Sequence, residues 1–168
     1  MQGRSFSLAA HDHDSCLSQA LSNAEILCRR RGARLTPLRR RVLELIWSEH
    51  RPYGAYELLE KLRAERGRVA PPTVYRALDF LLAQGLIHRI ESLNAFVGCA
   101  RPMDSHSGQF FICEACGVTA ELADRTTADR IDASARRIGF TVSRRIVEVQ
   151  GHCSDCSANH RSGSQRIG

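Results

Sequence analysis

Residues 71–85 read Pro-Pro-Thr-Val-Tyr-Arg-Ala-Leu-Asp-Phe-Leu-Leu-Ala-Gln-Gly, and this stretch decides the fold of the first half of the chain. Two prolines at its start and a glycine at its end are typical of helix boundaries. Its apolar residues recur at helical spacing and define a buried face: Val74, Leu78, Leu81 and Leu82. Thr73, Tyr75 and Arg76 then lie on or beside the exposed face near the N-terminus, where recognition helices contact DNA bases. The alternative for Tyr75 is a half-buried place in the core.

The flanking segments predict a winged helix-turn-helix domain over residues 15–99. Upstream, three segments show helical periodicity: one from Leu17 to Gly32, one after the N-cap pair Thr36-Pro37, and one that buries Leu58, Leu59 and Leu62 and stops near Gly67. Arg51-Pro52-Tyr53-Gly54 is expected to be a turn, with Tyr56 close behind it. Downstream, Leu86 to Glu91 and Ala95 to Cys99 are β-like runs joined by a short turn, typical of a wing.

A second, smaller α+β domain is expected over residues 109–156, after a linker at residues 100–108 that contains Pro and Gly. The pattern predicts strands at Phe110 to Ile112, Val118 to Leu122 and Phe140 to Val149. A helix with Ile131, Ala135 and Ile138 on one face lies between the last two strands. Residues 1–14 and 157–168 are polar and are expected to be disordered tails. The fold class is therefore α+β.

Two cysteine pairs, Cys113-Glu-Ala-Cys116 and Cys153-Ser-Asp-Cys156, are typical of a zinc site with four thiolate ligands. Such a site leaves no position for water or substrate, so we expect its zinc to be structural. The chain has seven cysteines, an odd number, which favours metal ligation in a reducing compartment over disulfides. Cys16 has no assigned role, and Cys28 is expected in the core.

A second set of candidate metal ligands lies at the joint between the two domains: His88, Cys99, His106 and Glu121. A metal ion bound by all four would fix the angle between the domains. One thiolate, two imidazoles and one carboxylate favour zinc over iron or manganese, although cobalt would also bind. The alternative is that each residue is separately ordinary: a surface His, a core Cys, a linker His and a solvated Glu. His152 and His160 are competing ligands.

The basic residues of the chain permit nucleic-acid binding, and their clustering matters more than their total number. The net charge is +6, and Lys61 is the only lysine among 24 basic residues. Seven arginines fall within thirteen residues: Arg29, Arg30, Arg31, Arg34, Arg39, Arg40 and Arg41. Beside a recognition helix they would contact phosphates and make binding salt-dependent, whereas alone they could form a solvated basic face. No apolar run approaches the ~18 residues that cross a bilayer, so no membrane partner is predicted and we expect a cytoplasmic protein.

These residues together resemble the ferric uptake regulator family, and most closely its zinc uptake regulator branch. The resemblance spans about residues 17–156 and lies in five stretches: Arg34-Leu-Thr-Pro-Leu-Arg39, Pro71-Pro-Thr-Val-Tyr-Arg-Ala-Leu-Asp-Phe-Leu81, Gly85-Leu-Ile-His88, Phe111-Ile-Cys-Glu-Ala-Cys-Gly117 and Gly151-His-Cys-Ser-Asp-Cys156. One departure from the iron-sensing branch is the single His106 where that branch usually has a His-rich run. This departure, with Cys99, argues against iron or peroxide sensing.

The resemblance implies a homodimer with two zinc ions per chain, a winged-helix DNA-binding domain and an α+β dimerisation domain. It places structural zinc on Cys113, Cys116, Cys153 and Cys156, and regulatory zinc on His88, Cys99, His106 and Glu121. It also makes Tyr56 a candidate contact to double-stranded DNA. With the residues argued from the helix and from the basic cluster, the candidate DNA contacts are Arg34, Arg39, Tyr56, Thr73, Tyr75 and Arg76.

We therefore expect a zinc-dependent repressor of zinc-uptake genes, which zinc at the hinge closes into a DNA-competent dimer. A zinc hydrolase would need an open metal position and a catalytic motif such as H-E-x-x-H, which the sequence lacks, so no enzyme and no small-molecule substrate is predicted. Two alternatives remain: an iron- or peroxide-responsive relative, and a zinc-stabilised protein-interaction module.

Overall fold

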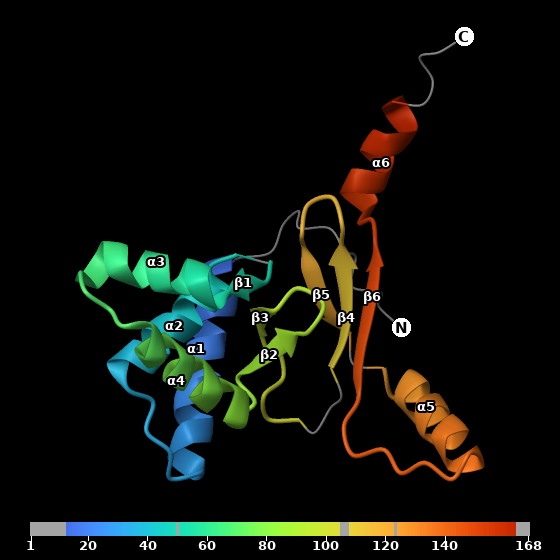
Figure 1. Ribbon diagram of the computed structural model, residues 1–168, viewed down its shortest axis with the longest axis horizontal. Coiled ribbons are helices and arrows are strands. Elements are labelled where there is room, and N and C mark those ends of the chain that lie inside the picture. The colour runs from blue at the N-terminus through green and yellow to red at the C-terminus, as the bar shows by residue number, and fades with distance from the viewer. Residues whose placement is uncertain (1–12, 50, 105–107, 123, 164–168) are drawn as a thin grey trace.

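The computed structural model describes residues 13–49, 51–104, 108–122 and 124–163 (Figure 1). Helices with a small sheet form the N-terminal part, and a second sheet with two further helices forms the C-terminal part. This arrangement confirms the predicted α+β class, with winged-helix architecture first.

Four helices build the N-terminal part: α1 (His13–Arg30), α2 (Pro37–Trp47), α3 (Ala55–Arg66) and α4 (Pro71–Ala83). Thr36 caps α2 as predicted, because its hydroxyl accepts a hydrogen bond from the backbone N–H of Arg39. Helix α1 begins at His13, so it includes the last two residues of the segment expected to be a tail, and residues 1–12 of that segment lie outside the described residues.

One apolar core joins the four helices. The predicted faces pack in it: Leu58, Leu59 and Leu62 of α3 are buried, and so is the stripe of α4 except for Leu82, which is partly buried. Cys28 is buried there as expected, and burial raises the pKa of its thiol. Burial of these faces packs α4 against the other helices, so the residues on its opposite side face solvent.

The wing is a hairpin of β2 (Ile87–Ile90) and β3 (Ala95–Gly98), antiparallel as predicted. A third strand, β1 (Tyr53–Gly54), pairs with β3, so the sheet order is β1-β3-β2. The sequence predicts only a turn at Tyr53 and Gly54, which is wrong because two residues are too few to show an alternating pattern. Asn94 takes a left-handed conformation (φ 47°) in the wing turn, which suits a tight hairpin.

The C-terminal sheet has the order β5-β4-β6: β4 (Gly108–Cys113), β5 (Thr119–Leu122) and β6 (Ile146–Gly151). Strand β4 is antiparallel to β5 and parallel to β6. Helix α5 (Arg125–Arg137) lies between β5 and β6 in the chain, and α6 (Ser154–Gly163) follows β6. No helix within these described ranges is both long and apolar enough to cross a membrane.

Two expectations for this part are corrected. The predicted strand from Phe140 to Val149 begins only at Ile146, because the backbone N–H of Phe140 bonds to the carbonyl of Ala135 and closes the end of α5 around Gly139 (φ 72°). Helix α6 continues to Gly163, where residues 157–168 are expected to be a disordered tail.

The two parts of the chain meet through the wing. Ile90 and Val97 of the wing are buried against Phe110 and Ile112 of β4, with Ile146 of β6 alongside. This apolar contact brings residues of the wing within bonding distance of the second sheet.

Candidate metal centres and nucleic-acid interface

The parallel pairing of β4 and β6 assembles the first candidate metal centre. Cys113 ends β4 opposite Gly151 of β6, so the turn that carries Cys116 lies beside the chain that carries Cys153 and enters α6. One sulfur atom from each of the four cysteines, Cys113, Cys116, Cys153 and Cys156, lies within 4.8 Å of all the others. We call this group the thiolate site.

The dimensions of the thiolate site suit zinc. Tetrahedral Zn–S bonds of about 2.3 Å separate sulfur atoms by roughly 3.8 Å, and the sulfur atoms of Cys116 and Cys153 lie 3.8 Å apart. Hydrogen bonds from the backbone N–H groups of Cys153 and Cys116 lower the pKa of Cys113 to about 6. The nearby sulfur atoms of Cys153 and Cys116 raise the pKa of Cys156 to about 12. One thiolate is therefore favoured without a metal, whereas four need a divalent cation among them.

The second candidate metal centre spans the joint between the two parts. His88 lies on β2, Cys99 directly follows β3, and Glu121 lies on β5. One ligand atom from each lies within 4.8 Å of the other two, and His88 Nε2 lies 3.0 Å from a Glu121 carboxylate oxygen. We call these three residues the hinge site. His106, the fourth predicted ligand, lies outside the described residues.

Glu121 does not fit the alternative in which each residue of the hinge site is separately ordinary, although the buried Cys99 does. Glu121 is not solvated: its side chain is 9% exposed, and it accepts a hydrogen bond of 3.1 Å from the backbone N–H of Ala100. Burial, followed by the charge of Glu121, raises the pKa of Cys99 to about 12. The ring of His88 lies 5.2 Å from that of Phe110. A thiol and a carboxylate buried together need a cation to share, so the donor set fits a bound zinc ion.

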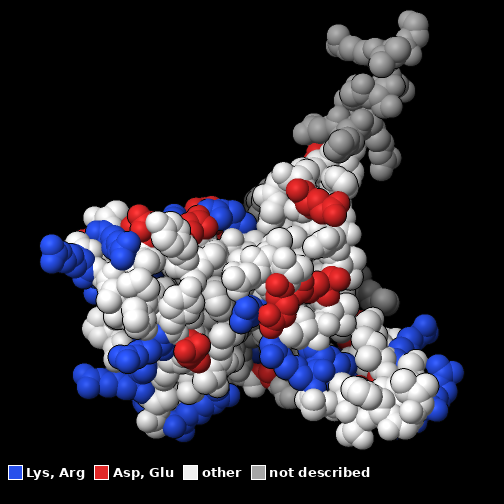
Figure 2. Space-filling model, viewed as in Figure 1, with Lys and Arg blue, Asp and Glu red and all other residues white. Residues whose placement is uncertain are grey.

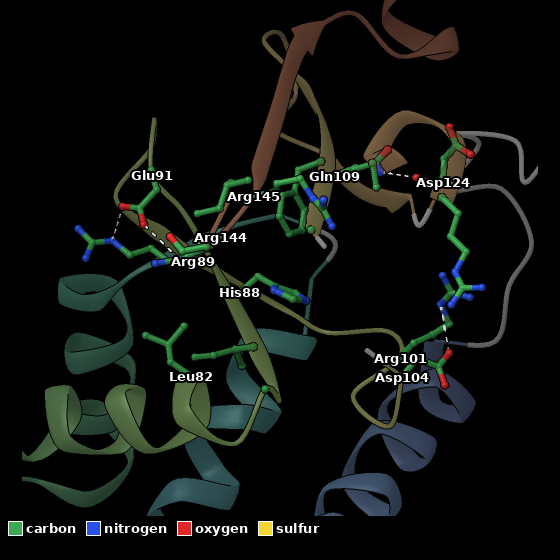
Figure 3. A pocket seen from close by; sticks show the side chains of 18 of the residues that line it. Leu82, His88, Arg89, Glu91, Arg101, Asp104, Gln109, Asp124, Arg144 and Arg145 are labelled. Carbon is green, nitrogen blue, oxygen red and sulfur yellow. Dashed lines mark hydrogen bonds and ion pairs between the residues drawn. The ribbon is translucent and has the colours of Figure 1, made fainter. Parts of the chain in front are cut away.

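A groove of about 1400 Å³ opens beside the hinge site, between the wing and the second sheet. His88 from β2 and Gln109 from β4 line it, and Figure 3 shows arginines along its wall, including Arg101, Arg144 and Arg145. Gln109 is buried and donates to the backbone carbonyl of Asp124 (2.6 Å), which fixes the start of α5.

The candidate nucleic-acid interface lies on the N-terminal part, where Figure 2 shows basic side chains projecting from its edges. Tyr56 at the start of α3 is 72% exposed, and Tyr75 on α4 is 55% exposed. Tyr75 is therefore not a core residue. Arg76 is also exposed, whereas Thr73 is half-buried. Helices α3 and α4 thus present two tyrosines and an arginine to solvent.

The arginine cluster divides into engaged and exposed members. Arg40 pairs with Glu25 and Glu44, and Arg41 pairs with Glu44 and Glu65. Arg31 donates a hydrogen bond to the backbone carbonyl of Gln84 (2.7 Å). Arg29, Arg30 and Arg34 are exposed and make no ion pair within the described part of the chain.

Arg39 is also engaged. Its guanidinium lies 3.6 Å from the centre of the Phe80 ring and donates to the carbonyl of Arg34 (2.6 Å). This packing orients the loop before α2 against α4, and it leaves Arg34 as the more exposed of the two arginines predicted to contact DNA.

One residue at the joint was missed by sequence reasoning: Glu148 of β6, whose carboxylate contacts the wing. No spacing or composition signal marks it, because the contact depends on the parallel register of β4 and β6.

The chain is similar to proteins of known family. The sequence profile of the Ferric uptake regulator family matches residues 30–150. The zinc uptake regulation protein of Escherichia coli strain K12 is 39% identical over 139 residues, covering 82% of this chain and 81% of that protein.

The chain is also similar to solved structures of zinc uptake regulators. A zinc uptake regulator complexed with zinc and DNA superposes with a TM-score of 0.82 at 37% identity, covering 86% of this chain and 97% of that one. The structure of holo XcZur superposes with a TM-score of 0.77 at 45% identity, covering 83% of this chain and 98% of that one. The structure of apo XcZur superposes with a TM-score of only 0.51 at 42% identity, covering 85% of this chain and 99% of that one. Since the coverage is similar, the present conformation is closer to the holo form.

Proposed function

The chain belongs to the ferric uptake regulator family of DNA-binding, metal-responsive transcription regulators, which are not enzymes, and on this premise we propose that it is a zinc-dependent repressor of zinc-uptake genes. The observation that carries the proposal is the hinge site, in which His88, Cys99 and Glu121 come from both sides of the joint. The E. coli relative is a zinc uptake regulation protein, which supports zinc as the signal.

The ligand types support zinc over iron. Cys99 offers a soft sulfur donor at the hinge site, and soft donors favour zinc over iron and manganese. Bound zinc would supply a shared bonding partner for an imidazole, a thiolate and a carboxylate. His106 is proposed as a fourth ligand. Cys113, Cys116, Cys153 and Cys156 are proposed to hold a second, structural ion, which gives two per chain.

The mechanism follows from where the ligands lie. His88 lies in the wing and Cys99 directly after it, whereas Glu121 lies in the second sheet, so under this proposal they move with different parts of the molecule. When these three side chains are held together, the angle between the two parts is fixed, and α4 keeps one orientation relative to the dimer axis. When they separate, the parts sample other angles and fewer molecules can place both α4 helices in the DNA grooves. The resemblance to holo XcZur supports this account.

The proposed dimer places two α4 helices on successive major grooves of a pseudo-palindromic operator. We propose that Tyr56, Thr73, Tyr75 and Arg76 approach base edges, while Arg34 and Arg39 lie near phosphates or orient the loop beside them. The structure complexed with zinc and DNA supports this role for α4, since it superposes over most of the chain.

The test is a zinc titration of DNA binding, using a duplex that the wild-type protein selects from random sequence at saturating zinc. We expect two zinc ions per wild-type chain, and DNA binding that rises as the second ion binds. Cys99→Ser should keep one ion and lose at least tenfold of the zinc-dependent affinity, because the thiolate ligand is lost.

Cys16→Ser is the matched control, since Cys16 lies on α1 away from both sites. Its titration should match the wild type. Zinc-independent DNA binding by the wild-type protein would refute the proposal, and an absence of salt-dependent DNA binding would favour a protein-interaction module.

A further inference from the structure

A row of three side chains crosses the second sheet and faces the wing. Phe110 of β4 pairs with Glu121 of β5 on one side and with Glu148 of β6 on the other. Directly paired residues project from the same face of a sheet. Phe110 is buried in the apolar contact with Ile90 and Val97, so the middle of the row packs against the wing.

The two carboxylates in this row hold opposite ends of the wing. Glu121 contacts His88 and the backbone N–H of Ala100, where the wing begins and ends. Glu148 contacts the wing tip: its two oxygens accept hydrogen bonds from the backbone N–H groups of Glu91 (2.7 Å) and Ser92 (3.1 Å). Each carboxylate therefore joins the two parts of the molecule.

The two backbone N–H groups at the wing tip favour the ionised form of the Glu148 carboxylate. Partial burial by itself raises the pKa of Glu148, but hydrogen bonds from the Ser92 side chain and from the two backbone N–H groups outweigh it, and the pKa is lowered. Hydrogen bonds to an ionised acceptor are stronger than those between neutral groups. Arg144 lies 3.7 Å from Glu91, and Figure 3 shows both at the edge of the groove with Arg89.

We propose that Glu148 is a positioning residue, which docks the wing tip on the second sheet and thereby sets how much zinc is needed to close the molecule. This inference rests on the proposed function and deepens it. The contact needs no metal, so it stabilises the closed arrangement whether or not the hinge site is loaded. Closure and zinc binding are linked, because zinc favours closure by the same factor by which closure favours zinc binding, so a variant that closes less readily needs more zinc.

The test is Glu148→Gln in the full chain, titrated with zinc against the selected duplex. The amide keeps the shape of the side chain but turns an N–H toward one of the two backbone donors, so that contact is lost. We expect about a tenfold rise in the zinc concentration that gives half-maximal DNA binding. At saturating zinc the affinity should return to at least the wild-type level, and the zinc stoichiometry should stay at two.

The direction of the shift in the zinc midpoint distinguishes a positioning role of Glu148 from a general effect of its charge on DNA binding. Removing a negative charge strengthens DNA binding in general. Glu60→Gln is the matched control, because it makes the same charge change on an exposed position of α3, away from the joint. Glu60→Gln should leave the zinc midpoint unchanged. An equal shift in both variants would overturn the proposal.

A second readout reports the contact directly. In the zinc-loaded wild type, the backbone N–H groups of Glu91 and Ser92 should exchange slowly with deuterium, and in Glu148→Gln they should exchange faster, while those of the β2–β3 ladder stay protected. Either an unchanged midpoint or unchanged exchange at these two groups would overturn the proposal. A loss of affinity that persists at saturating zinc would also overturn it, because Glu148 would then act on DNA or on the dimer.

These results are distinguishable from failure of the proposed function. If wild-type DNA binding does not depend on zinc, the proposed function fails first. If the wild type depends on zinc and Glu148→Gln has the same midpoint, only the role of Glu148 fails.

Discussion

Arginines that are close in sequence make different contacts in this protein. Arg40 and Arg41 are held by glutamates of α1, α2 and α3, whereas Arg76 on α4 is exposed and makes no ion pair with the part of the chain that the structure describes. An arginine held by carboxylates gives up those contacts before it can bind phosphate. We therefore expect the exposed arginines to contribute more of the DNA affinity than their share of the net charge suggests.

Arg76→Ala tests this difference. We expect operator affinity to fall about tenfold, because a guanidinium that reads a base edge or a phosphate contributes on the order of 1–3 kcal/mol. Fluorescence anisotropy with the selected duplex at saturating zinc measures it. Arg40→Ala removes the same charge from an arginine that is already paired with glutamates, and it should lower the operator affinity clearly less. Equal losses for both variants would mean that net charge alone drives binding.

The division among the arginines could not be predicted from sequence. Arg41 pairs with Glu65, 24 residues away, and this pairing exists only once α2 packs against α3. The same holds for the hinge site: the residue types suggested a metal, but the burial of Glu121 depends on tertiary packing. The thiolate site was easier to predict, because each C-x-x-C pair is local in sequence.

At the level of elements, the wing is positioned by close contact with α2. Gly98 at the end of β3 faces Trp47, and a Cβ atom at Gly98 would lie 2.2 Å from that indole ring. Only glycine allows this approach. The ring therefore fixes the start of the segment that carries Cys99.

Gly98→Ala should lower stability by about 1–3 kcal/mol, because the added methyl group forces Trp47 or the strand to move. Thermal unfolding of the zinc-loaded protein measures it. Gly151→Ala is the matched control: a Cβ there meets nothing within 4 Å, so its midpoint should change little. If both variants unfold at the wild-type temperature, the contact between Gly98 and Trp47 does not constrain the wing.

Elements with a long periodic pattern were predicted well, and short or context-dependent ones were not. Helices α2, α3 and α4 repeat their apolar residues over several turns, so their existence and buried faces follow from sequence. Strand β1 is only two residues long and exists because β3 pairs with it. The late start of β6 reflects the backbone closure after α5, which no side-chain pattern encodes.

At the level of the whole molecule, one apolar surface has no partner within the described part of the protomer. Helix α5 buries only Ala128, while Ile138 at its end is 82% exposed and nearby Phe140 is 60% exposed. Large exposed apolar side chains that lie together are typical of protein interfaces. This surface supports the proposed homodimer.

Ile138→Glu should shift the protein from dimer toward monomer, because it places a charge in the proposed interface while costing the isolated protomer little. Sedimentation equilibrium at micromolar concentration measures the shift, with circular dichroism to confirm retained helix content. Ile26→Glu, at an exposed position of α1, is the control and should stay dimeric. A dimeric Ile138→Glu variant would place the interface elsewhere.

The parallel pairing of β4 with β6 also has a consequence for biosynthesis. Cys113 and Cys153 are 40 residues apart, and their strands become neighbours only after α5 has been made. While the ribosome is still adding the residues between them, the nascent chain carries one dithiol with no second pair to complete a tetrahedral cage. We therefore expect metal loading of the thiolate site to follow translation of β6 and of the second cysteine pair behind it, with Cys113 and Cys116 relying on a reducing environment until then.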